Sequence, residues 1–150
     1  MLDNLERKNR IKKYARLAAE IGLNVQKGEE VWISASLDQP EFVAMIVEEC
    51  YKLGAKKVVV DWSYPKLTEL AFKYQSASTL ATLNNIEKAR YLYRLKKLPS
   101  LLYIDSDDPD GMKSINPKKF AKAQMKKYPK IQKYRDALED KYKWCIIGAP

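Results

Sequence analysis

The sequence predicts a three-layer α/β fold, with a mainly parallel four-stranded sheet, flanking helices and a Rossmann-like or flavodoxin-like topology. Short apolar runs rich in strand formers alternate with segments whose apolar residues recur every three or four positions. A strand, a helix and a second strand also follow one another within residues 31–62, as in the βαβ unit of parallel sheets. A chain of 150 residues suits a single domain with a substantial core.

The first helix is predicted near residues 3–21, where it ends at Gly22. Its apolar face comprises Ile11, Tyr14, Ala15, Ala18 and Ile21. Residues 31–37 are rich in strand formers and give the first strand. Asp38 and Glu41 have the spacing of a capping box, and Pro40 suits the first turn of the helix that follows. The buried face of that helix is predicted to be Phe42, Val43, Ile46, Val47, Cys50 and Tyr51, and Gly54 ends it.

The run at residues 57–62 predicts a second strand covered on both faces. Weaker periodicity predicts a helix at residues 67–74 and one longer helix at 80–98, and residues 101–105 give a third strand. Asn116 and Pro117 then begin a long basic helix. Its inner face is predicted to be Phe120, Gln124, Tyr128, Ile131, Tyr134 and Leu138, and Pro129 should kink or divide it.

The last residues, 143–150, predict a fourth, buried strand with nothing after it to cover it. We interpret this ending as a chain cut before a further domain. Because the chain contains no histidine, triads and histidine metal sites are excluded within it. Cys50 and Cys145 fall on a predicted helix and a predicted strand, which favours free thiols over a disulfide. No apolar run is long enough to span a membrane and no secretory signal is present, so a cytoplasmic protein is expected.

Ligands of open α/β sheets bind beyond the carboxyl ends of the strands. The candidates there are residues 34–36, 61–63 and 105–110. Asp105 and Asp107 resemble the start of an aspartyl phosphotransferase motif, and a calcium loop anchored on Asp108 and Asp110 is a further alternative. Both patterns are incomplete, so an acidic surface turn is the favoured interpretation. The five glycines form no phosphate-binding loop.

Net charge is +9, and residues 111–150 hold 11 basic but only 3 acidic side chains. Basic side chains of the long helix could contact phosphates, which predicts salt-dependent binding of RNA or another polyanion. They are Lys118, Lys119, Lys122, Lys126, Lys127, Lys130, Lys133 and Arg135. They alternate with an apolar face, as in a solvated outer helix, so nucleic-acid binding remains the alternative function.

Several strings, in this order and spacing, resemble the N-terminal domain of the aminopeptidase T family of metal-dependent aminopeptidases. They are residues 13–17, 22–28, 31–34, 47–55, 58–63, 107–109, 134–135 and 144–150. The resemblance implies that residues 1–150 are an accessory α/β domain that helps enclose an active-site chamber and is inactive alone. It further implies a homodimeric hydrolase that releases N-terminal residues from peptides.

The resemblance also implies two divalent metal ions, zinc, cobalt or manganese, held by glutamates, histidines and an aspartate of a catalytic domain that these residues lack. In such a site the metals polarise the scissile carbonyl and lower the pKa of a bound water. None of those ligand positions occurs in this chain. We therefore expect no catalytic, cofactor-binding or metal-binding residue here, and peptides rather than membranes or nucleic acids as partners.

Overall fold

Four parallel strands form one sheet in the order β2-β1-β3-β4. The strands are β1 (Glu30–Ser36), β2 (Lys57–Ser63), β3 (Ser100–Asp105) and β4 (Trp144–Gly148). Every neighbouring pair is parallel. This order is that of flavodoxin-like sheets, so the predicted α/β class and topology are confirmed.

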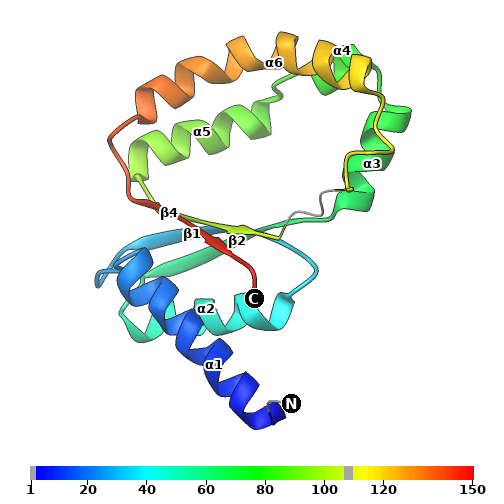
Figure 1. Cartoon of the computed structure of the whole chain (residues 1–150). Helices are drawn as coiled ribbons and strands as arrows, with labels where there is room; N and C mark the ends of the chain where they lie inside the picture. Colours follow the sequence, from blue (N-terminus) through cyan, green and yellow to red (C-terminus); the bar gives the residue numbers. More distant parts are fainter. Residues whose placement is uncertain (1–2, 107–109) are drawn as a thin grey trace. The chain divides into compact units, whose positions relative to one another are not determined.

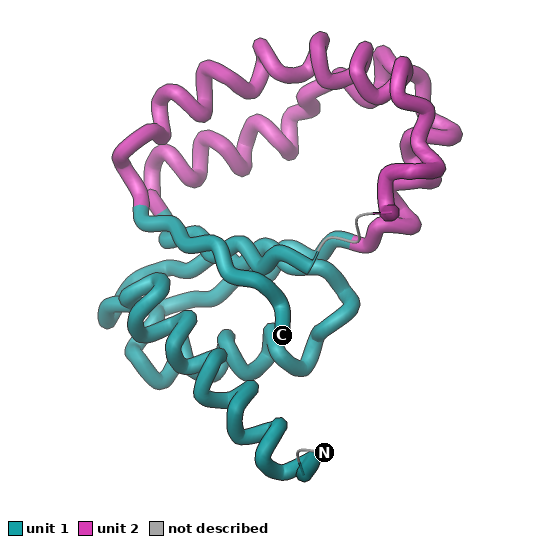
Figure 2. The backbone as a smooth tube through the Cα atoms, viewed as in Figure 1, with its two compact units in different colours: residues 1–63, 99–106, 143–150 teal, residues 64–98, 107–142 magenta. Residues whose placement is uncertain are grey.

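The computed structural model describes residues 3–106 and 110–150, which divide into two units (Figures 1 and 2). Unit 1 comprises residues 1–63, 99–106 and 143–150 and contains the sheet. Unit 2 comprises residues 64–98 and 107–142 and contains only helices among its described residues. No helix of the described residues is long and apolar enough to cross a membrane.

In unit 1, helices α1 (Asn4–Leu17), η1 (Ala18–Gly22) and α2 (Pro40–Lys52) pack on one face of the sheet (Figure 1). The sheet contributes Val31, Ile33, Ala35, Leu102 and Ile104 to this core, and the helices contribute Ala15, Ala18, Ala19, Phe42, Val43, Ile46 and Cys50. Each fully buried Leu, Ile, Val or Phe side chain stabilises the fold by about 1.5–3 kcal/mol. The core therefore forms between the apolar faces of the helices, which repeat every 3.6 residues, and the apolar face of the sheet, which repeats every two residues.

The first helix follows the prediction as far as Leu17, and then continues as the π-helix η1. A π-turn has more residues than an α-turn, so the side chains after Leu17 rotate away from the positions that regular α-spacing assigns. Ala18 and Ala19 are buried, but Ile21 is 68% exposed. Its predicted place on the apolar face is wrong for this reason.

Helix α2 begins at Pro40, as predicted, but its N-cap is Gln39 and no side chain caps it. The predicted capping role of Asp38 is wrong, because its carboxylate instead accepts a hydrogen bond from Ser106 Oγ (3.1 Å). Tyr51 is 49% exposed rather than buried. Its hydroxyl accepts a hydrogen bond from the N–H of Val58 (3.2 Å), which keeps the ring at the surface.

Unit 2 contains α3 (Pro65–Tyr74), α4 (Ala77–Leu80), α5 (Asn85–Lys97) and α6 (Pro117–Leu138). The single helix predicted at residues 80–98 is wrong, because α5 starts afresh at a capping box. Asn84 Oδ1 accepts from the N–H of Glu87, and the Glu87 carboxylate accepts from the N–H of Asn84, both at 2.9 Å. Helix α3 has no buried residue. Its predicted apolar face is therefore largely exposed.

Helix α6 begins at the predicted cap, since Asn116 Oδ1 accepts from the N–H groups of Lys118 and Lys119. Pro129 lies inside α6 without dividing it. Contacts to α5 hold both halves: Lys127 pairs with Glu87 (3.0 Å), and the rings of Tyr134 and Tyr91 stack with centroids 4.9 Å apart.

The predicted inner face of α6 is wrong at two positions. Gln124 and Tyr128 are exposed, whereas Ala123 is buried. Successive steps of four residues drift off a helix face whose period is 3.6. Tyr134 and Leu138 are buried as predicted.

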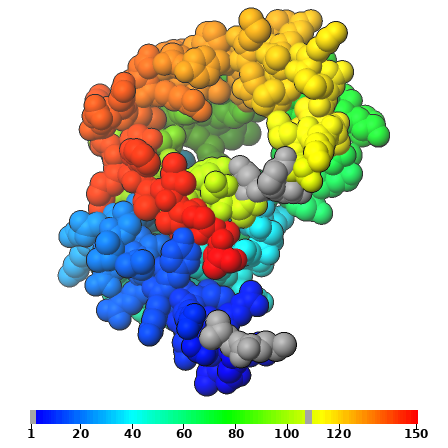
Figure 3. Space-filling model, viewed as in Figure 1, coloured from blue at the N-terminus to red at the C-terminus, as the bar shows by residue number. Residues whose placement is uncertain are grey.

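Strands β2 and β4 are the two edges of the sheet. The prediction that both strands are buried is wrong. Trp62, Trp144 and Ile146 are 45%, 63% and 60% exposed, while Cys145 and Ile147 contact the core. Successive side chains of a strand point to opposite faces, so Trp144 and Ile146 point away from the core that Cys145 and Ile147 contact. The C-terminal residues, red in Figure 3, lie at the surface in that view. Both cysteines are free, as predicted.

Candidate functional site

The carboxyl ends of the four strands meet at one edge of the sheet, because all strands are parallel. Register places Ser34 beside Asp61 and Tyr103, and Asp105 beside Gly148. The sequence prediction that residues 34–36, 61–63 and the start of 105–110 share this edge is confirmed. Asp107 and Asp108 lie outside the described residues.

Hydrogen bonds join the loops of this edge to one another. The N–H of Leu37 donates to the carbonyl of Ser63 (3.0 Å), and the N–H of Ala149 donates to the carbonyl of Asp105 (2.8 Å). Gln39 Nε2 also donates to the carbonyl of Pro150 (2.8 Å). These polar groups are thus committed to holding the four strand ends together.

The two acidic-loop alternatives gain no support from the described geometry. Asp105 is an exposed residue at the end of β3, and the partner that the phosphotransferase motif needs, Asp107, lies outside the described residues. For a calcium loop, Asp110 already pairs with Lys113 (2.6 Å), and the hydroxyl of Ser106 donates to Asp38. The first contact is local, as in the surface turn that the sequence favours, and the second joins this loop to the loop after β1.

The described residues do not fit a site for two metal ions. They contain no group of three or more His, Cys, Asp or Glu side chains close enough to hold even one ion. The full sequence has no histidine. Dinuclear sites need several carboxylate or imidazole ligands on two ions about 3.5–4 Å apart. We therefore derive no catalytic step through a metal from this chain.

The sheet face opposite the helices of unit 1 combines aromatic and polar side chains, which sequence reasoning missed. Register puts Leu101 beside Trp144, and Tyr103 beside both Ile146 and Ser34, so these side chains share a face. Tyr103, Trp144 and Ile146 are 40%, 63% and 60% exposed. The sequence offers no signal for this face, because residues 144–147 are all apolar and do not alternate with polar residues.

The basic side chains of α6 do not form one open stripe. Lys127 pairs with Glu87, and Lys130 Nζ donates to the carbonyl of Ala81 (3.0 Å). The guanidinium of Arg135 lies over the ring of Tyr128, 5.9 Å from its centroid. Part of the positive charge thus stabilises unit 2 itself, which weakens the prediction of a continuous phosphate-contacting surface.

A family model described as thermophilic metalloprotease (M29) matches residues 7–150. Aminopeptidase AmpS of Bacillus subtilis is 32% identical over 137 residues, which cover 91% of this chain and 33% of that protein. Aminopeptidase 2 of Geobacillus stearothermophilus is 29% identical, with 92% and 34% covered. Aminopeptidase T of Thermus thermophilus is 28% identical, with 88% and 32% covered. The sequence resemblance to the aminopeptidase T family is confirmed.

The solved structure of wild-type AmpT from Thermus thermophilus superposes with a TM-score of 0.82 at 23% sequence identity. The match covers 95% of this chain and 36% of that chain. This likeness shows the fold and confirms the three-layer α/β class. The chain spans about a third of the length of the curated relatives that it matches.

Proposed function

Because the chain belongs to the thermophilic metalloprotease (M29) family, we propose that residues 1–150 are the N-terminal accessory domain of a metal-dependent aminopeptidase. The whole protein would release N-terminal residues from peptides. This domain would help enclose the active-site chamber and limit entry to small peptides, and it would be inactive alone.

One observation carries the proposal. The family match extends over nearly the whole chain, from residue 7 to residue 150, yet the chain spans only 28–34% of the relatives' lengths. The relatives are named aminopeptidases. The segment that each shares with this chain is a minor part of its length. The lack of a fitting metal-ligand set among the described residues supports placing the chemistry elsewhere.

The exposed face of β4 supports an accessory role. Trp144 and Ile146 are large apolar side chains on an edge strand, and both are more than half exposed. Natural proteins rarely leave such an edge open, because an unpaired strand readily pairs with another chain. The rest of the proposed enzyme would cover this strand.

The cofactors and partners follow from the same proposal. Two divalent ions, zinc, cobalt or manganese, would be held by residues outside this chain and would supply a water of lowered pKa near neutral pH. The enzyme would act on peptides in the cytoplasm as a homodimer. This chain would enclose part of the active-site chamber and would supply no metal ligands.

The test is an assay of residues 1–150 against aminoacyl substrates with cobalt, zinc or manganese. We expect no turnover with any metal, and metal-dependent hydrolysis would refute the domain assignment. The DNA downstream of the codon for Pro150 gives an independent test. We expect it to encode a domain containing glutamates and histidines, and a stop codon there would also refute the assignment.

A further inference from the structure

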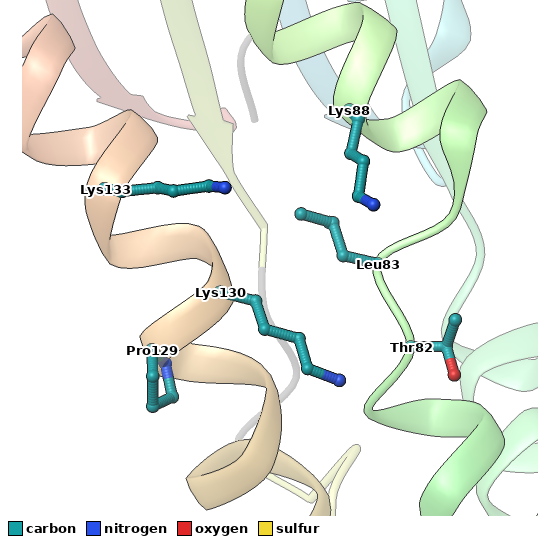
Figure 4. Close-up of a pocket in the computed structure, with 6 residues that line it drawn as sticks. All are labelled: Thr82, Leu83, Lys88, Pro129, Lys130 and Lys133. Carbon is teal, nitrogen blue, oxygen red and sulfur yellow. The ribbon is translucent and has the colours of Figure 1, made fainter.

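Unit 2 contains a pocket of about 400 Å³ between α6, α5 and the segment that joins α4 to α5 (Figure 4). It is lined by Thr82, Leu83, Lys88, Pro129, Lys130 and Lys133. Small-molecule sites in proteins have volumes of about 300–1,000 Å³. The pocket therefore has room for a small ligand.

Three of the six lining residues are lysines, and they come from two helices. Lys88 extends from α5, while Lys130 and Lys133 extend from adjacent turns of α6 toward the same space (Figure 4). Lys130 Nζ donates one hydrogen bond to the carbonyl of Ala81 (3.0 Å), which fixes its position and leaves two N–H groups. Lys133 Nζ lies 5.0 Å from the centroid of the Tyr134 ring.

No carboxylate lines the pocket. Within the part of the chain that the structure describes, Lys88 and Lys133 form no ion pair. Glu87, the neighbour of Lys88, is committed to Lys127 (3.0 Å) and to the N–H of Asn84 (2.9 Å). Three like charges facing one space repel one another, so a bound anion would remove a destabilising interaction.

We propose that this pocket binds an oligophosphate, either as a free chain or as the phosphates of a nucleotide. Three separated ammonium groups complement a ligand whose charge is spread along several phosphates. Lysine binds phosphate as a point charge, whereas planar carboxylates are better recognised by the guanidinium fork of arginine, which this pocket lacks. The hydroxyl of Thr82 donates to the carbonyl of Ser78 (3.0 Å), so the lysines supply the donors.

The experiment is a calorimetric titration of sodium tripolyphosphate into the purified protein at about 0.15 M ionic strength, where the Debye length is about 8 Å. We expect saturable one-to-one binding that the double variant Lys88→Gln and Lys133→Gln weakens about tenfold or more. The matched control is Lys118→Gln with Lys122→Gln, which removes the same charge from exposed positions of α6 two or more turns from the pocket. It should change the affinity less than about twofold, because distant exposed charges are screened. Equal weakening in the two double variants, or no saturation, would overturn the proposal.

The chemical class is tested with further ligands on the same proteins. Similar affinities for tripolyphosphate and ATP would assign recognition to the phosphate chain, and tighter binding of ATP would assign it to a nucleotide. Citrate binding as tightly as tripolyphosphate would refute phosphate recognition. A random oligonucleotide is the last ligand. If it binds the pocket variant and the control variant equally while tripolyphosphate does not bind, anions bind a diffuse basic surface and the pocket proposal is refuted.

Thermal unfolding keeps the test valid if a variant folds poorly. Tripolyphosphate should raise the Tm of the wild type and of the control variant, since a ligand that binds only the folded state stabilises it. The pocket variant without ligand should unfold at or above the wild-type Tm, because it loses repulsion. A pocket variant stabilised as much as the wild type by the ligand would refute the site.

Discussion

Lys143 Nζ lies 2.6 Å from Glu29 Oε1, joining the start of β4 to the start of β1 at the amino edge of the sheet. Strand β3 lies between these two strands, and its Ser100 donates to the same oxygen (3.3 Å). The other carboxylate oxygen accepts from the N–H of Gln26 (2.7 Å). One side chain therefore holds three strands in register.

We expect the Glu29–Lys143 pair to stabilise unit 1 measurably. A double-mutant cycle with Glu29→Gln and Lys143→Met should give a coupling energy of about 1 kcal/mol by urea unfolding, decreasing at high salt. The control is the exposed pair Glu6–Arg10, whose cycle should give about 0.3–0.5 kcal/mol. A coupling for Glu29–Lys143 no larger than the control would show that the bridge contributes nothing beyond a surface ion pair.

Gly54 should not tolerate a side chain. Its φ is +97°, and an added Cβ would lie 3.1 Å from the Cα of Lys27. We expect Gly54→Ala to lower the free energy of unfolding by about 1–2 kcal/mol or more, from left-handed backbone strain and this close contact. Gly148→Ala is the matched control, because its Cβ would meet nothing within 4 Å. It should change stability by less than about 0.5 kcal/mol in the same denaturation assay.

The thiol of Cys50 should be protonated and unreactive in the folded protein. Burial, followed by the nearby Glu49 carboxylate, raises the pKa of this thiol to about 11. The folded state thus favours the neutral thiol. The stability gained is fully present below the ordinary thiol pKa and is lost as the pH rises toward 11.

Two measurements check this prediction. A disulfide reagent at pH 8 should label Cys145 before Cys50, since only Cys50 is fully buried. Between pH 9 and about 11, stability should fall more steeply in the wild type than in Cys50→Ala. Parallel pH profiles for the two proteins would contradict the assigned role of the thiol.

The capping box should set the start of α5. Asn84→Ala removes the acceptor for the N–H of Glu87 and should cost about 1 kcal/mol by thermal or urea unfolding. Asn85→Ala, one residue further on and without a cap contact, is the control and should be neutral within about 0.5 kcal/mol. Equal effects of the two changes would exclude the cap as the cause.

The same box predicts an acid dependence of stability. Partial burial alone would raise the pKa of Glu87, but the N–H of Asn84 and the ammonium of Lys127 outweigh burial and lower this pKa. The stabilisation is therefore present above the ordinary glutamate pKa and is lost as the pH falls through the lowered value. Glu87→Gln should flatten this part of the pH profile of unfolding.

Local sequence signals predicted most element starts and ends, and they failed where a signal was overlooked or a period was extended too far. Asn84 and Glu87 have the spacing of a capping box inside the predicted long helix. The start of a new helix at this point could therefore be predicted from the sequence. The exposure of Ile21 could not be predicted in this way, because a π-turn arises from packing rather than from a sequence period. Asp38 had the cap spacing, but Ser106, far along the chain, determines its contact.

At the candidate site, sequence reasoning placed the strand ends at one edge but could not say how their polar groups are used. The contact of Gln39 with Pro150, and that of Leu37 with Ser63, depend on which loops become neighbours in the sheet. The three lysines of the pocket contribute to the net charge, but the net charge does not indicate where they lie. Their convergence depends on the packing of α5 against α6.

The sequence by itself determined the α/β class, the four strands and the family, because periodicity and local strings are properties of neighbouring residues. Tertiary structure alone decided that β2 and β4 are the edges, that Trp144 and Ile146 remain exposed, and that Lys88 meets Lys130 and Lys133. Strand order and helix packing result from contacts between residues far apart in the chain. No local pattern specifies those contacts, since each depends on the burial that the whole chain achieves.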